Sequence, residues 1–88
     1  MSIQLGRSNA DLIAALESAI EAAIPGAEVE VVSGSPAHFA VRVVSPAFAG
    51  KNRVQQQQMV YGALAPFMSG DDAPVHAIDE LRTEVPQA

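Results

Sequence analysis

The chain of 88 residues contains no cysteine, and this absence excludes several kinds of chemistry. Without thiols the protein cannot form a disulfide, cannot offer a thiolate to a metal ion and cannot hold an iron–sulfur cluster through cysteines of its own. Any chemistry with a soft metal would therefore need thiolates from another molecule. A cysteine nucleophile is excluded for the same reason.

Aromatic and basic residues are also scarce. The 49% hydrophobic content includes only three phenylalanines and one tyrosine, so valine, isoleucine and leucine must form most of a thin core. The length fits one domain, predicted over 1–88 with frayed ends at 1–7 and 86–88. Five basic residues against ten acidic ones give a net charge of −5, which opposes sequence-independent binding to phosphate groups through many Lys and Arg contacts. Dimerisation or a partner would bury additional surface.

Long hydrophobic runs are missing as well. No stretch approaches the roughly 20 apolar residues of a membrane-spanning helix. The N-terminus shows no basic flank followed by an apolar run, so no secretory signal is visible. These absences predict a cytoplasmic protein.

The motifs of nucleophilic enzymes are absent from the sequence. There is no Gly-x-Ser-x-Gly elbow, no evident grouping of serine, histidine and aspartate, and no phosphate-binding glycine loop. Three serines, Ser33, Ser35 and Ser45, flank predicted turns, which explains them without catalysis. We therefore expect a protein that is not an enzyme.

The first predicted element is a helix. Ser8 and Asp11 have the spacing of a capping box. Apolar residues then follow at helical period: Leu12, Ile13, Leu16, Ile20 and Ile24. Pro25-Gly26 ends this helix.

A β-hairpin is predicted next. Residues 28–31 alternate with period two, 33–36 have the composition of a turn, and 38–43 alternate again with Phe39 on the core side. Ser45-Pro46 ends the second strand, because proline cannot donate a ladder hydrogen bond.

A short helical turn at 46–50 and a helix at 52–68 are predicted after the hairpin. The spacing places five residues of the longer helix on one face: Val54, Gln57, Tyr61, Leu64 and Met68. Gln55 and Gln56 are predicted to point outward. Pro66 is predicted to kink or shorten the helix.

The last predicted element is a strand at 75–85. Ala77, Leu81 and Thr83 share one phase, whereas Ile78 points to the other side, and a bulge near Asp79 is compatible with this slip. A helical crossover allows this strand to lie parallel to its neighbour. The prediction is an α+β fold with helices on one face of a three-stranded mixed sheet.

Two histidines are the candidate metal ligands, His76 and His38. An imidazole at the start of a strand can be a ligand, an acid–base group or a hydrogen-bonded edge residue. Spacing favours the structural role for both, because isolated histidines seldom ligate without companions. Two histidines also cannot complete a zinc site.

A nucleic-acid interface is the other candidate site. Lys51 and Arg53 at a helix start could contact phosphate with the help of free backbone amides. Gln55 and Gln56 could read adenine edges in a major groove. Basic residues at a helix N-terminus oppose its dipole, however, and consecutive glutamines are typical of a neutral surface.

A family resemblance adds to this interpretation. The segments FAGKNRV (48–54), VY (60–61) and HA (76–77) resemble the signature of BolA proteins, and HF (38–39) and VVS (43–45) agree with it. The predicted order of elements is similar to that family's α+β fold, αββααβ, which is similar to the class II K-homology fold.

Particular positions resemble the YrbA/IbaG branch of that family. Gln57-Gln58 is similar to this branch, whereas many BolA proteins have Arg-His at 56–57. The short hairpin loop at 34–37 also resembles it. Ser35 stands where another branch has a cysteine, and 85–88 replaces the usual Thr-Pro-x-x-Trp ending.

The resemblance implies a partner of monothiol glutaredoxins. A 2Fe-2S cluster would be shared among a glutaredoxin cysteine, glutathione and this chain, with the family histidine at His76 and His38 as the second candidate. The isolated protein, a monomer or weak homodimer, would hold no cluster. The family's alternative role is transcriptional regulation through DNA binding at 48–61.

Overall fold

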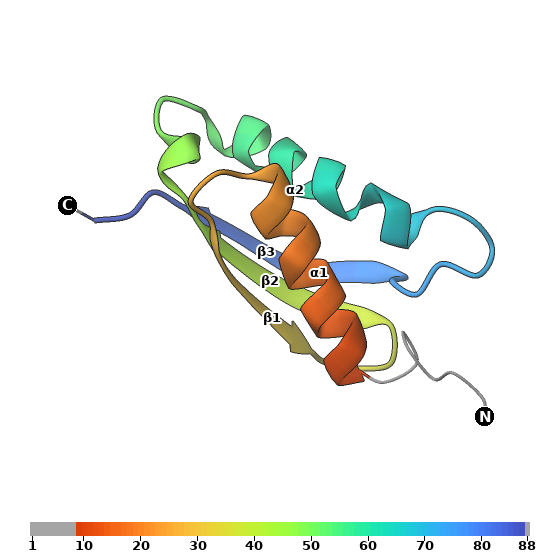
Figure 1. The fold of residues 1–88 in the computed structure, drawn as a ribbon. Helices are drawn as coiled ribbons and strands as arrows, with labels where there is room; N and C mark the ends of the chain where they lie inside the picture. Colours follow the sequence, from red (N-terminus) through yellow and green to blue (C-terminus); the bar gives the residue numbers. More distant parts are fainter. Residues whose placement is uncertain (1–8, 88) are drawn as a thin grey trace.

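The computed structural model describes residues 9–87, and its elements follow the predicted order (Figure 1). They are α1 (Asn9–Ala23), β1 (Glu28–Ser33), β2 (His38–Val44), the 3-10 turn η1 (Pro46–Phe48), α2 (Arg53–Met68) and β3 (Ala77–Glu84). The predicted cap at Ser8 and tail at 1–7 lie outside the described residues, as does Ala88. None of the described helices is long and apolar enough to cross a membrane.

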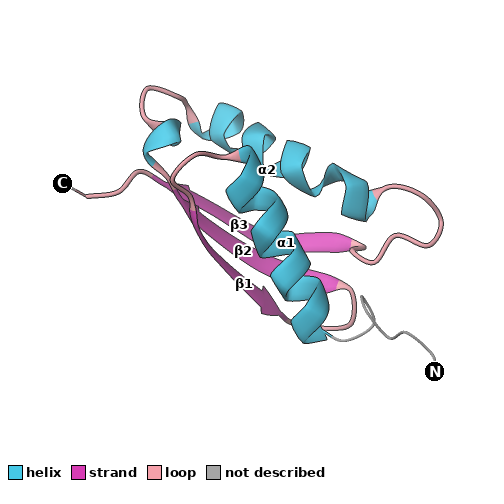
Figure 2. Ribbon diagram, in the orientation of Figure 1, coloured by secondary structure: helices cyan, strands magenta, loops and turns pink. Residues whose placement is uncertain are grey.

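The three strands form one mixed sheet in the order β1-β2-β3. β1 and β2 are antiparallel, with Val31 opposite Val41, and the loop between them spans 34–37. β3 lies parallel to β2 because α2 carries the chain back to the end of the sheet where β2 begins. Both helices cover the same face of the sheet, as predicted (Figure 2). We call the uncovered side the open face.

A bulge interrupts the pairing of β2 with β3. Phe39 pairs with Ile78 and Ala40 with Glu80, so Asp79 is the extra residue. Ile78 and Leu81 both pack against the core although they are three positions apart. In a regular strand they would face opposite sides, because side chains alternate with period two. The bulge that the sequence left open is therefore present, and Ile78 faces the core together with Leu81, contrary to the orientation predicted for it.

The core lies between the helices and the covered face of the sheet. Its buried hydrophobic residues are Leu12, Leu16, Ile20, Ile24, Val31, Phe39, Val41, Val43, Phe48, Val60, Leu64 and Val75. Ser45 is the buried polar residue: its hydroxyl donates to the carbonyl of Pro25 and accepts from the amide of Ala47. This serine has the structural role predicted for it, because it joins the turns after α1 and β2.

The face that α2 buries agrees with the predicted one only in part. Leu64 is buried as predicted, but Val54 is 60% exposed and Tyr61 41% exposed, and Val60, which lies outside the predicted face, is buried. Gln56 was predicted to point outward, but its amide oxygen accepts a hydrogen bond of 2.7 Å from Thr83 on β3. Packing against the sheet thus turns α2 so that Gln56 and Val60 face β3 and the core, while Leu64 stays buried.

Pro66 does not shorten α2. The helix continues through Pro66 to Met68, the last residue predicted for it. Pro66 itself is exposed. Ser69 follows the helix, and its hydroxyl donates a hydrogen bond of 2.9 Å to the carbonyl oxygen of Ala65, so a side chain supports the last turn.

Candidate functional site

The two histidines lie at the same end of the sheet, one at the start of β2 and one directly before β3. His38 is the first residue of β2, and it pairs with Ala77, the first residue of β3. His76 directly precedes Ala77, and the backbone amide of His76 donates 2.9 Å to the carbonyl of Ala37. Because neighbouring strands are about 4.8 Å apart, two residues 38 positions apart in the sequence become close neighbours along the backbone.

His38 lies on the open face, since Phe39, its neighbour on β2, is buried in the core. Its Nδ1 is 2.9 Å from Oδ1 of Asp79, the bulged residue of β3. The side chains are 39% and 55% exposed, so solvent reaches both. The bulge thus supplies a carboxylate that holds one nitrogen of the His38 ring.

The imidazole of His76 is exposed and makes no hydrogen bond with residues 9–87. Only its backbone is held, through Ala37. Ala37 adopts a left-handed φ of 64°, and it closes a tight hairpin loop in which the His38 amide bonds to Ser35. The histidine that the family resemblance favours is therefore carried by a well-anchored backbone and has a free ring.

Within residues 9–87, no three side chains of histidine, cysteine, aspartate or glutamate come together closely enough to hold a metal ion. Two imidazoles cannot complete the coordination of a metal centre. A metal at this end of the sheet would need further ligands from a second molecule. The donor set fits imidazole ligation of a metal whose remaining ligands are external.

The predicted nucleic-acid residues lie at the start of α2, where an N-terminal capping box is formed. Asn52 accepts from the Gln55 amide at 2.8 Å, and the Gln55 side chain accepts from the Asn52 amide at 3.0 Å. Lys51 and Arg53 are both exposed beside this cap. The two basic residues are thus accessible, while the Gln55 side chain is engaged in capping the N-terminus of the helix.

The Gln56 side chain is fully used within the protein. Its amide nitrogen donates to the carbonyl oxygens of Phe48, at 3.2 Å, and Lys51, at 2.9 Å, while its oxygen accepts from Thr83. These contacts connect the loop before α2 to β3. The sequence carries no signal for this role, because it depends on which face α2 turns to the sheet.

Most residues of the family signature have structural roles in this protein. Phe48 and Val60 are fully buried in the core. Gly50 has a φ of 79°, which a residue with a side chain rarely adopts. The exposed side chains of the signature include those of Lys51, Arg53, Val54, Tyr61 and His76, and these are available to a partner.

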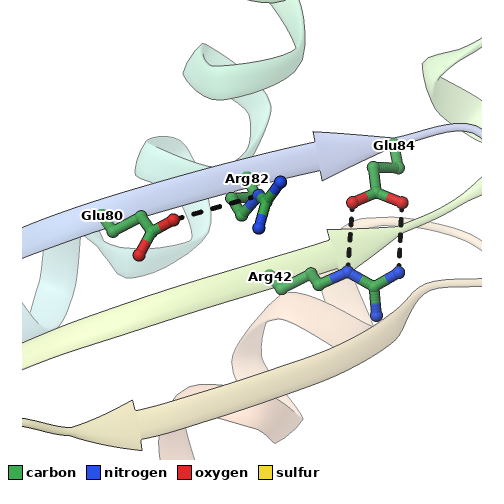
Figure 3. A network of polar contacts seen from close by, with 4 residues as sticks. All are labelled: Arg42, Glu80, Arg82 and Glu84. Carbon is green, nitrogen blue, oxygen red and sulfur yellow. Dashed lines mark hydrogen bonds and ion pairs between the residues drawn. The ribbon is translucent and has the colours of Figure 1, made fainter.

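Beyond His38, the open face carries charged residues of both signs (Figure 3). Arg42 on β2 forms two parallel hydrogen bonds with Glu84 on β3, each 3.1 Å long. Arg82 and Glu80 form a looser ion pair of 3.9 Å along β3. The hydrogen bonds from Arg42 lower the pKa of Glu84, and the same contact raises the pKa of Arg42. This pair is a half-exposed electrostatic link between the parallel strands.

We expect the Arg42–Glu84 pair to make the free energy of unfolding depend on pH in the acid range. Folding lowers the pKa of Glu84. The ion pair therefore contributes fully to the free energy of unfolding above the ordinary carboxyl pKa of about 4.3, and this contribution disappears as the pH falls through the lowered pKa. Glu84→Gln should therefore unfold more easily than the wild type at neutral pH, with a difference that shrinks toward pH 3. Urea unfolding at several pH values measures this difference.

The matched control for that experiment is Glu80→Gln, since the carboxylate of Glu80 makes a single, 3.9 Å contact among residues 9–87, with Arg82. The pair is well exposed, so the effect of Glu84→Gln should be modest. An effect of Glu84→Gln that stayed constant from neutral pH to pH 3 would contradict this role of the pair.

The fold and the signature define a class of small α+β proteins, and comparison with known families agrees. Residues 15–87 match the family model described as BolA-like protein. The chain belongs to the BolA-like family.

Several relatives are similar to this chain. An uncharacterized protein from the rpoN-murA intergenic region of Acinetobacter guillouiae is 40% identical over 63 residues, which cover 72% of each chain. The acid stress protein IbaG of Escherichia coli is 43% identical over 47 residues, or 53% of this chain and 54% of IbaG. This match spans only about half of IbaG, but it is consistent with the YrbA/IbaG-like branch.

Solved structures show the same fold. A BolA homologue from Coxiella burnetii superposes with a TM-score of 0.67 at 28% identity, covering 90% of this chain and 91% of the other. Mouse BolA1 gives a TM-score of 0.66 at 30% identity over 85% of this chain and 65% of its own. The predicted BolA-like α+β fold is thus confirmed.

Proposed function

We propose that this protein is a non-enzymatic adaptor in iron–sulfur cluster trafficking or iron sensing. In this proposal it binds a monothiol glutaredoxin and supplies a histidine ligand to a 2Fe-2S cluster, with a glutaredoxin cysteine and glutathione as the other ligands. His76 provides the first imidazole, and His38 is the candidate for a second.

The observation that carries the proposal is the position of the two histidines in a chain without cysteine. His38 begins β2 and His76 directly precedes β3, so both lie at the same end of the sheet. Both are accessible, and the described residues offer no complete metal site. Such a donor set can contribute nitrogen ligands to a cluster whose thiolates come from elsewhere, and imidazole ligation raises the potential of a 2Fe-2S centre.

We expect the purified protein to bind no cluster when it is alone, because it supplies no thiolate. Anaerobic mixing with a monothiol glutaredoxin, iron, sulfide and glutathione should yield a complex. Its visible circular dichroism should differ from that of the glutaredoxin cluster alone. Stoichiometric iron and stable visible absorbance in the partner-free protein would contradict the proposal.

Regulation of transcription through DNA binding is the second candidate function, and the exposed Lys51 and Arg53 at the start of α2 favour it. The engaged side chains of Gln55 and Gln56 weaken it, because reading bases would require their existing hydrogen bonds to break. Two binding measurements on the purified protein, one with glutaredoxin and one with DNA, distinguish the two functions. Failure to bind glutaredoxin, together with DNA binding that falls steeply with salt and is lost in a Lys51→Ala/Arg53→Ala variant, would favour DNA.

A further inference from the structure

The bulged residue of β3, which is not part of the family signature, contacts one of the two histidines. Asp79 is the extra residue between Ile78 and Glu80, and its Oδ1 is 2.9 Å from Nδ1 of His38. A regular strand would have no unpaired residue at this position. Bulges commonly re-aim a side chain, and here the carboxylate reaches the ring at the start of the neighbouring strand.

The chemistry of this contact determines where the proton of a neutral His38 ring lies. An ionised carboxylate has no proton to donate and can only accept hydrogen bonds. Nδ1 must therefore be the donor, and the other ring nitrogen, Nε2, then carries the free lone pair. In metal sites, ligating histidines are commonly oriented in this way by a carboxylate on the opposite nitrogen.

We propose that Asp79 is a positioning residue for His38: it holds the neutral imidazole as the Nδ1–H tautomer and leaves Nε2 as the ligand atom for a metal ion. The remaining ligands of that metal come from a second molecule. The inference rests on the proposed function for the identity of the metal, an iron of the shared cluster. The arrangement of Asp79 and His38 itself rests only on this chain.

The bulge also explains why Asp79, and not its neighbour, has this role. Ile78 and Leu81 are both committed to the core, so two residues lie between them on the exposed side. Glu80 pairs with Ala40 in the ladder and its carboxylate contacts Arg82 at 3.9 Å. The adjacent carboxylates thus have different partners, and Glu80→Ala is a control that removes the same charge one position away.

The first test uses the protein alone, without a histidine tag, at about pH 8, where an ordinary imidazole is neutral. Nitrogen-15 NMR of the histidine rings distinguishes the two tautomers. His38 should be mainly Nδ1–H in the wild type and in Glu80→Ala. In Asp79→Ala it should revert to the Nε2–H form that free histidine prefers. A wild-type His38 that is mainly Nε2–H would overturn the inference.

The second test measures ligation with Ni²⁺ held by nitrilotriacetate, which leaves coordination positions open for a protein ligand. Broadening of the His38 signals reports binding at this ring. Asp79→Ala should weaken it by about tenfold, the lower end of the usual cost of removing a supporting carboxylate, whereas Glu80→Ala should not. Equal nickel affinity in Asp79→Ala and the wild type would overturn the inference.

These measurements are separate from the test of the proposed function. If the wild-type protein forms no cluster complex with glutaredoxin, the proposed function fails, but the tautomer and nickel results still decide the role of Asp79. If the complex forms, Asp79→Ala should lose its cluster to a chelator about tenfold faster than Glu80→Ala. The same rate of loss in both variants would count against Asp79 as a positioning residue.

Discussion

Replacing His76 by alanine should remove or change the histidine ligation of the shared cluster and leave the fold intact. The side chain is exposed and makes no hydrogen bond with residues 9–87, and alanine keeps the backbone contact with Ala37. We therefore expect a loss of unfolding free energy of about 1 kcal/mol or less. The loss of cluster affinity should exceed the roughly 10- to 100-fold that follows from removing a supporting group, because the ligand itself is gone.

Visible circular dichroism of the glutaredoxin complex measures this effect, and urea unfolding of the isolated variant shows whether the fold is retained. His38→Ala is the comparison, with a smaller expected effect on the cluster. Gln58→Ala, an exposed change on α2, controls for unspecific damage. If the spectrum stayed unchanged in His76→Ala and the cluster were lost in His38→Ala, the two histidines would exchange roles.

Phe48→Ala should cause a large loss of stability. Phe48 is fully buried and is one of only three phenylalanines in a thin core. Truncating a buried phenylalanine typically costs about 3–5 kcal/mol, since it removes apolar contacts and leaves a cavity. Domains are stable by only about 5–15 kcal/mol, so this change should remove a large part of the total.

Urea unfolding followed by far-ultraviolet circular dichroism measures the free energy of the Phe48→Ala variant. Val54→Ala is the matched control, because Val54 is 60% exposed on the neighbouring helix and should change stability by less than about 0.5 kcal/mol. A loss below about 1 kcal/mol in Phe48→Ala would mean that Phe48 does not support the core as its burial implies.

Much of the fold follows from local patterns. The helical spacing from Leu12 to Ile24 and the alternation at 38–43 predicted α1 and β2, and Pro25-Gly26 marked the end of the first helix. These signals are strong because burial repeats along one element with a fixed period. The parallel placement of β3 also followed, since a helical crossover favours it. The single domain and its frayed ends stay predictions.

The face of α2 could not be predicted in the same way. Spacing places Val54, Tyr61 and Leu64 on the core face, but Val54 and Tyr61 are exposed, and Leu64 is buried together with Val60. Which side of this helix is buried depends on the sheet against which the helix packs.

The candidate site was predictable in its residues but not in its arrangement. The sequence and the family resemblance indicate His76 and His38, whereas the only sign of Asp79 in the sequence is a slip in the alternation of the last strand. Its contact with His38 spans 41 positions of the sequence. Local pattern contains no information on which side chain of a neighbouring strand will be within hydrogen-bond distance.

The sequence alone determined the absence of thiolates, the order of helices and strands, and the two imidazoles available to a metal. These are properties of composition and of short-range periodicity, which do not depend on how the elements meet. The tertiary structure decided which face of α2 is buried, how Gln56 is used and which carboxylate holds the ring of His38. These depend on strand register and packing between distant segments, and the bulge at Asp79 exists because Ile78 and Leu81 must both reach the same core.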